Sequence, residues 1–350
     1  MDQEILRKIC KIAEVSHLSF LFGAGVSAPF ISPLAAIEKQ MDDAETQGKQ
    51  DEAIKLKREF FSKVMLPCLD IKTFSYSQDK GEKKKEALTQ TYESYQSFLI
   101  EITRYLLCRK STLLDKQVNL FTTNIDIFLE KILEDSGANY NDGFIGHMNP
   151  SFRTSHFQTI IKKKSEYLER QSEVPTFNLY KLHGSLTWKP EDDKKVIGYS
   201  DLSVLKNIEK LKDKEFNDSY SNLNIVNPNR KKFATSVLES TYYELFRLYA
   251  TELEKENVLL IVAGFSFGDD HILQVTRRAM DSNPTLSVCI LCHDKEKEEE
   301  YKKKFEGVRY ANNLYIIKDE GNKIDLKWAV ENFISKFDQK HETKIYAEKA

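Results

Sequence analysis

Short runs of apolar residues alternate along this chain with longer segments in which apolar residues recur at helical spacing. Apolar runs of four to seven residues that end at small or polar residues are typical of buried strands in a parallel sheet. Such runs occupy residues 18–22, 118–121, 176–182, 258–263, 286–291 and 314–317, and 224–226 is a shorter candidate. Helical spacing marks residues 124–133, 236–256 and 326–337, and two further segments that begin at Asp269 and Lys295. Strands that alternate with helices predict an α/β fold with a Rossmann-like, doubly wound and mostly parallel sheet.

A change of character divides the chain into an α/β domain and an inserted segment. Residues 36–110 are rich in Lys, Glu, Gln and Asp and carry apolar residues at helical spacing. We expect them to form a helical insertion with a charged, solvent-exposed loop near residues 78–85. We therefore predict three parts. The α/β domain contains residues 1–35 and 111–338, the helical insertion residues 36–110, and a polar tail residues 339–350.

Composition and charge are those of an ordinary soluble protein. The 350 residues are 41% apolar and 30% charged, and 52 basic against 54 acidic side chains give a formal net charge of −2. This balance provides no overall attraction to a polyanion, so direct nucleic-acid binding is not supported. The N-terminus lacks the pattern of a signal peptide, and no run approaches the roughly 20 apolar residues of a membrane span. We therefore expect a cytoplasmic protein with no membrane partner.

The cysteines predict neither a disulfide framework nor a zinc site. Of five cysteines, only Cys289 and Cys292 form a C-x-x-C pair, whereas a zinc ribbon needs a second pair. Their place in the apolar run from Leu286 to His293 favours buried strand cysteines. We therefore expect no zinc ribbon, no bound metal and a reducing compartment.

Four short phrases occur where apolar runs give way to small or polar residues. They are Gly23-Ala24-Gly25-Val26-Ser27, Thr122-Thr123-Asn124-Ile125-Asp126, Lys181-Leu182-His183-Gly184-Ser185 and Gly264-Phe265-Ser266-Phe267-Gly268-Asp269. In open parallel α/β sheets, ligands bind at the carboxyl ends of the strands. The phrases are therefore expected at one edge of the sheet, where their glycine turns, amide, carboxylate and imidazole can hold and cleave a dinucleotide.

The first phrase has the spacing of a phosphate-binding turn. Gly23, Gly25 and Ala28 match G-x-G-x-x-A directly after a predicted strand. Glycine permits a tight turn and a close approach of the backbone to phosphate, and the helix N-terminus that follows attracts negative charge. Pro29 and Pro33 prevent a long regular helix at this point, and no ribose-binding acid is evident after a second strand. This argues against an ordinary nicotinamide dehydrogenase, and a tight turn without a ligand remains open for this motif alone.

The other three phrases also have structural alternatives. Thr123 or Asn124 can cap a helix, and Asp126 near a helix start is stabilised by the helix dipole. A histidine beside a glycine, as at His183, is often structural, but imidazole is the side chain best suited to proton transfer near neutral pH. The small residues of 264–268 can admit an adenine ribose, or they form a plain loop before a helix cap.

In this order, the four phrases resemble the motifs of the sirtuin family: G-A-G-x-S, then T-x-N-x-D, then H-G, then G-x-S. In sirtuins a large Rossmann-type domain and a smaller helical, zinc-binding part hold NAD between them. The resemblance implies an NAD site that includes Gly23, Thr123 and Asp269. It further implies roles for individual residues: Ala24, Gly25 and Ser27 at the phosphates and ribose, Asn124 at the nicotinamide ribose, Asp126 at the carboxamide, His183 as the base, and Gly264 and Ser266 at the adenosine.

Three departures separate this chain from the protein deacylases of that family. Thr123 stands where they have Gln, residues 184–260 contain none of their four zinc cysteines, and the first loop continues as Ala28-Pro-Phe-Ile-Ser-Pro33 instead of G-I-P-D-F-R. The T-T-N-x-D and G-F-S-F-G-D variants resemble the sirtuin-like NADases of bacterial antiphage defence, which hydrolyse NAD without deacylating a protein.

The function expected from this resemblance is NAD glycohydrolysis, with Asn124 orienting ribose hydroxyls and water and His183 accepting a proton. Unrestrained loss of NAD would kill a cell, so we expect a gated effector of antiphage defence that acts by abortive infection. By analogy with defence systems, the gate is a homo-oligomer or a companion ring-forming ATPase. An NAD-dependent protein deacylase and a non-catalytic module that senses NAD or ADP-ribose remain open as alternatives. A nuclease is less favoured, because no cluster of metal ligands is evident.

Overall fold

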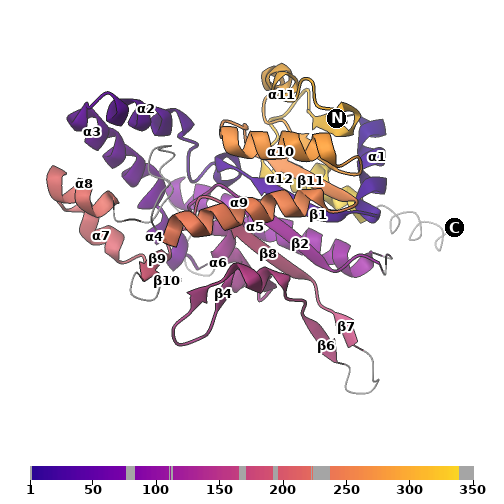
Figure 1. The fold of residues 1–350 in the computed structure, drawn as a ribbon, viewed down its shortest axis with the longest axis horizontal. Helices are drawn as coiled ribbons and strands as arrows, with labels where there is room; N and C mark the ends of the chain where they lie inside the picture. The colour runs from indigo at the N-terminus through magenta and orange to yellow at the C-terminus, as the bar shows by residue number, and fades with distance from the viewer. Residues whose placement is uncertain are drawn as a thin grey trace.

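A seven-stranded, all-parallel sheet forms the centre of the computed structural model (Figure 1). The structure describes residues 2–75, 83–109, 111, 113–164, 171–191, 196–221, 223 and 237–338. The strands of the sheet are β1 (His17–Phe22), β2 (Gln117–Thr122), β3 (Asn139–Asn141), β8 (Thr176–Lys181), β11 (Val258–Ala263), β12 (Ser287–Leu291) and β13 (Leu314–Ile317). Their order is β13-β12-β11-β1-β2-β8-β3, and every neighbouring pair is parallel. The predicted Rossmann-like α/β class is confirmed.

Helices cover both faces of the sheet, because each central strand buries side chains on both sides. In β1, Phe20 and Phe22 belong to one apolar core and Leu21 to the other. The first core is completed by α1 (Gln3–Glu14), α5 (Lys83–Cys108), α6 (Phe128–Asp135), α12 (Leu326–Asn332) and the 3₁₀ segment η7 (Ile334–Asp338). The second is completed by α9 (Val237–Glu254), α10 (Asp270–Ser282) and α11 (Glu298–Lys304).

Smaller elements extend this three-layered body. Helices α2 (Ala35–Thr46), α3 (Gln50–Phe60) and α4 (Cys68–Thr73), with the π-helical turn η2 (Phe61–Met65), form one extension, against which α7 (Val204–Glu209) and α8 (Asp213–Ser221) pack (Figure 1). A four-stranded sheet contains β4 (Phe144–Ile145), β5 (Ser151–Phe152), β10 (Val196–Tyr199) and β9 (Trp188–Glu191). A projecting hairpin contains β6 (Lys162–Lys164) and β7 (Gln171–Glu173) (Figure 1). Short 3₁₀ segments occur at Ala24–Ser27, Thr154–Gln158, Lys295–Lys297 and Ala311–Asn313.

The strand order changes direction between β1 and β11. From β1 the chain moves outward through β2 to the edge strand β3 and then inserts β8 between them. It returns to the other side of β1 with β11 and continues outward through β12 and β13. Such a switch point opens a crevice at the carboxyl ends of the strands, which is where ligands bind in this class of fold.

The strand predictions agree with the structure to within two residues at each end, and the runs 258–263 and 314–317 agree at both ends. The helix expected over residues 124–133 begins only at Phe128, because residues 123–127 form a loop. The short candidate strand 224–226, the tail 339–350 and residues 78–82 of the charged loop lie outside the described residues.

Two further observations bear on the sequence predictions. Helix α5, from the segment expected as an insertion, packs on the sheet itself, where the Phe98 ring lies 4.9 Å from Phe20 and 5.2 Å from Phe22. Cys289 and Cys292 are buried and unpaired as expected, and burial raises the pKa of both thiols. Within the described ranges, no helix is both long and apolar enough to cross a membrane.

Candidate functional site

The structure brings the four phrases together at the carboxyl edge of the sheet. Strands β11, β1, β2 and β8 are neighbours and end in register, with Ala263 beside Phe22, Phe22 beside Thr122, and Thr122 beside Lys181. The backbone ladder continues one residue further, since the Leu182 amide donates to the Thr122 carbonyl at 2.8 Å. Residues that lie far apart in the chain therefore begin their loops side by side, and two of the loops flank the switch point.

The glycines of the first and fourth phrases are required by their contact with each other. A Cβ added to Gly25 would lie 2.8 Å from Gly264 Cα, and one added to Gly264 would lie 2.5 Å from Val26 N. A Cβ on Gly23 would lie 2.6 Å from Gly264 O. Gly264 also has φ +63°, a conformation that favours glycine. These glycines are thus explained by backbone packing at the switch point, and Ala24 is the exposed residue of the first turn.

A buried hydrogen-bond network joins the first two phrases, and its directions follow from chemistry. The Ser27 hydroxyl lies 2.7 Å from Asp126 Oδ2, which only accepts, so the single serine proton points to Asp126. Ser27 Oγ must then accept from Asn124 Nδ2 and from the Tyr95 hydroxyl, each at 3.1 Å. Burial and the charge of Asp126 raise the pKa of Tyr95, which keeps the donating proton in place. Ser27 is fully buried, and all its hydrogen-bonding capacity is used within the protein.

The same network fixes the orientation of the Asn124 amide. Asn124 Nδ2 donates to the Gly23 carbonyl at 3.1 Å as well as to Ser27, and a carbonyl can only accept. The nitrogen must therefore face Gly23, and Oδ1 is the atom of the amide that can accept a hydrogen bond from a ligand or water. Asn124 is 9% exposed and Asp126 5% exposed, so both residues are buried.

Both carboxylate oxygens of Asp126 accept hydrogen bonds from other groups of the protein. Oδ2 accepts from Ser27, and Oδ1 accepts from the Phe128 amide at 3.0 Å, at the start of α6. The Asp126 carbonyl accepts from the buried Lys181 ammonium, which also pairs with Glu130 at 3.0 Å. Thr123 is half-buried beside this network.

Sequence reasoning missed several groups that hold this loop. Tyr95 comes from α5, and Lys181 and Ser185 both reach Glu130 on α6, with Ser185 Oγ 2.7 Å from Glu130 Oε1. Lys181 and Ser185 stand within the third phrase, so a buried lysine at a strand end was an available signal. The role of Tyr95 had no signal, because its spacing fits an ordinary core position of a helix.

His183 lies in the neighbouring loop and contacts the last residue of the fourth phrase. Its Nε2 lies 3.0 Å from Asp269 Oδ2, and the two side chains are 20% and 21% exposed. The other carboxylate oxygen, Oδ1, accepts from the backbone amides of His271 at 2.8 Å and Ile272 at 3.2 Å, so Asp269 also caps α10. Burial alone would raise the pKa of Asp269, but the hydrogen bond and charge of His183, with the amides of Ile272 and His271, hold it below its ordinary value.

The fourth phrase is anchored from α11. Tyr301 donates to the Phe265 carbonyl at 3.0 Å, and Lys304 donates to the Ser266 carbonyl at 2.7 Å. Phe267 is buried with φ +53°, an uncommon conformation for a residue with a side chain. The Ser266 side chain stays half-exposed while its backbone is fixed. Within the described residues there is no group of three or more His, Cys, Asp and Glu side chains that could hold a metal ion.

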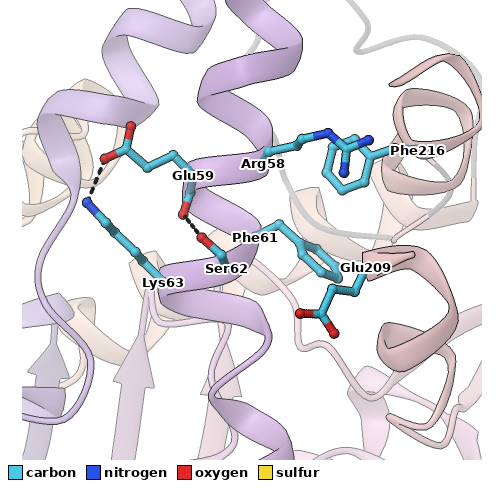
Figure 2. Close-up of a pocket in the computed structure, with 7 residues that line it drawn as sticks. All are labelled: Arg58, Glu59, Phe61, Ser62, Lys63, Glu209 and Phe216. Carbon is cyan, nitrogen blue, oxygen red and sulfur yellow. Dashed lines mark hydrogen bonds and ion pairs between the residues drawn. The ribbon is translucent and has the colours of Figure 1, made fainter. Parts of the chain in front are cut away.

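A hollow of about 460 Å³ lies elsewhere, between the end of α3 with η2 and helices α7 and α8 (Figure 2). Its lining contains none of the residues of the four phrases. The basic groups in it already have acidic partners, since Lys63 pairs with Glu59 at 2.6 Å and Arg58 with Asp213 at 2.8 Å. We therefore place the candidate site at the sheet edge, where the four phrases lie side by side, and not in this hollow.

Comparison with known protein families gave a match over part of the chain. A family model described as a SIR2-like domain matches residues 118–311, more than half of the chain. The matched part contains most of β2, all of β8 and β11, and the second, third and fourth phrases in full, whereas Gly23–Ser27 precede it. A search of curated proteins gave no match.

Proposed function

Because the chain belongs to the SIR2-like domain family, we propose that it is an NAD glycohydrolase that cleaves NAD to nicotinamide and ADP-ribose. The observation that carries the proposal is the placement of Asn124 and His183 just beyond the ends of two neighbouring strands. Each stands two residues beyond one of the neighbouring strands β2 and β8, and each has a side chain fixed by hydrogen bonds. An oriented amide and an oriented imidazole at a strand edge suit attack by water on a bound nucleotide.

The reaction needs little acid catalysis, because the leaving nicotinamide is already cationic. The bond between ribose C1′ and the pyridine nitrogen breaks, and both electrons go to that nitrogen, which becomes neutral. A water oxygen then bonds to C1′ and releases one proton. The site has to hold the ribose, stabilise the positive charge that develops on it, and take up this proton.

The fixed orientations assign one task to each group. Asn124 can offer only Oδ1 to a ligand, because both amide protons are used by Gly23 and Ser27, so it would accept from a ribose hydroxyl or from the attacking water. The His183 ring would accept the proton that the water releases. The adenosine and phosphates would lie at the switch point, over the loops that follow β1 and β11.

The direct test is turnover of NAD by the purified full chain. We expect nicotinamide and ADP-ribose in equal amounts, and losses of about 10²–10⁴-fold in His183→Ala, as for removal of a general base. Asn124→Ala should lose activity by a similar factor, whereas His147→Ala and Asn149→Ala, both at exposed positions, should not. Unchanged activity of both site variants would reject the site, and nicotinamide release that requires an acyl-lysine peptide would favour a deacylase.

We also propose that hydrolysis is gated by assembly, as in an effector of antiphage defence that acts through abortive infection. Constant loss of NAD is incompatible with growth, and Ser27, Asn124 and Asp126 are at most 9% exposed and bonded mainly to one another. Self-association or a companion ring-forming ATPase would open this arrangement. Activity measured alongside particle mass, with and without such an ATPase and nucleic acid, tests this. Full activity of a monomer would contradict it.

A further inference from the structure

Asp269 makes a contact with His183 that its role as the cap of α10 does not require. Asp269 already satisfies the first turn of α10 through Oδ1, which accepts from two backbone amides. Oδ2 is not needed for the cap, and it lies 3.0 Å from His183 Nε2. The N-cap of α1, Asp2, makes the same two backbone contacts through Oδ1, to residues two and three positions further on. The contact with an imidazole is therefore an addition to an ordinary capping arrangement.

We propose that Asp269 is a positioning residue, which holds His183 with a proton on Nε2 so that Nδ1 is the nitrogen that accepts the proton from water. This inference rests on the proposed function. A carboxylate only accepts hydrogen bonds, so the 3.0 Å contact requires a proton on Nε2. In the neutral ring the lone pair is then on Nδ1, and the tautomer is set by the second partner of the ring.

The backbone on both sides of the pair holds His183 and Asp269 in place. Gly184, directly after the histidine, has φ +79°, a conformation that favours glycine. Asp269 is held by the two backbone amides, and the loop before it is tied to α11 through the carbonyls of Phe265 and Ser266. In the described part of the chain, Asp269 is the ionisable group paired with the ring, and both are accessible enough to meet a ligand.

This role differs from direct contact with NAD, which the sequence implied for Asp269. A residue that binds the nucleotide acts mainly on KM, whereas one that orients the base acts on kcat. When the proton reaches Nδ1, the imidazolium stays beside the Asp269 carboxylate, and the opposite charge stabilises it. Loss of that charge makes the protonated ring less stable.

The test uses Asp269→Asn, because asparagine caps helices as well as aspartate and its side-chain oxygen can still accept the backbone amides. We expect kcat to fall at least about 10-fold and at most by the factor seen in His183→Ala. KM for NAD should change less than about threefold. The acid limb of the kcat/KM profile should move to lower pH. Asp2→Asn, the matched cap on α1, should behave as the unmodified protein.

Nuclear magnetic resonance of the imidazole nitrogens supplies a readout that needs no turnover. In the unmodified chain we expect His183 to carry its proton on Nε2, and in Asp269→Asn we expect a changed tautomer population. An unchanged tautomer, or a raised KM with an unchanged kcat, would overturn the inference. Absence of NAD turnover in the unmodified protein, both alone and with the companion ATPase and nucleic acid, would instead reject the proposed function, and the ring spectra would still decide the pairing.

Discussion

The Ser27 hydroxyl lies 2.7 Å from Asp126 Oδ2, and this contact joins the turn after β1 to the loop after β2. The two residues are 99 positions apart in the chain and are nearly or fully buried. Because the serine proton points to the carboxylate, Ser27 accepts from the Asn124 amide and cannot be turned toward a ligand without breaking this bond. Ser27 therefore holds the amide of the candidate site in place from beneath.

The first prediction concerns Ser27→Ala, which removes the centre of this network. The change leaves Asp126 Oδ2 and one Asn124 N–H without their buried partner, and we expect a loss of about 1–3 kcal/mol in the free energy of unfolding. NAD turnover should fall as well, because Asn124 is no longer held. Urea unfolding and an activity assay measure the two effects. Ser155→Ala, at an exposed position, is the control, and equal stability of the two variants would contradict the assigned network.

Much of the fold could be predicted because the central strands are buried on both faces. All six residues of β11 are buried, so this strand is an unbroken apolar run in the sequence. It can be predicted without knowing which elements pack against it. The edge strand β3, Asn-Tyr-Asn, has no such run and was not predicted. The start of α6 was placed too early, because polar residues that could cap a helix at Asn124 instead form the loop of the site.

The candidate site could be located from the sequence, but its internal contacts could not. The four phrases lie at strand ends, and the parallel sheet brings strand ends together wherever they occur in the chain. Which side chains then touch depends on loop geometry, so the pairs Ser27–Tyr95 and His183–Asp269, 68 and 86 positions apart, left no trace in the pattern. Tyr95 in particular has the spacing of a core residue of α5.

A second prediction tests why the loops at the switch point contain glycine. Gly264 and Gly137 have φ +63° and +62°, so alanine at either position should cost about 1–2 kcal/mol for the left-handed backbone. At Gly137 a Cβ meets nothing within 4 Å, whereas at Gly264 it lies 2.5 Å from Val26 N. We therefore expect Gly264→Ala to be less stable than Gly137→Ala by a further 1–3 kcal/mol or so, as measured by urea unfolding. Equal losses would show that the loops are not packed as described.

The third prediction concerns the pH dependence of stability through Asp269. Its folded pKa lies below the ordinary value of 3.8, so the unfolded chain takes up a proton first as the pH falls. The contribution of Asp269 is complete above the unfolded pKa and is lost as the pH falls through the folded pKa. The difference in unfolding free energy between the unmodified chain and Asp269→Asn should be constant above about pH 5 and shrink below about pH 4. A difference that grows toward pH 3 would contradict the direction of the shift.

The last prediction compares two lysines whose carboxylate partners, Glu130 and Asp135, both lie in α6. Lys181 is 3% exposed, pairs with Glu130 at 3.0 Å and donates to the Asp126 carbonyl, whereas Lys131 pairs with Asp135 at 2.7 Å near the surface. We expect Lys181→Met to lower the free energy of unfolding by up to about 3–5 kcal/mol, because the Glu130 carboxylate then lacks the ammonium with which it pairs. Lys131→Met should cost less than about 1 kcal/mol.

The double variant Lys181→Met with Glu130→Gln separates lost charge pairing from lost packing. If the unpaired carboxylate causes the instability, neutralising Glu130 should restore a large part of the unfolding free energy. NAD turnover should stay low in the double variant, because the Asp126 carbonyl still lacks the ammonium that holds the loop of Asn124. Full recovery of turnover together with stability would show that Lys181 supports the fold alone and does not position the site.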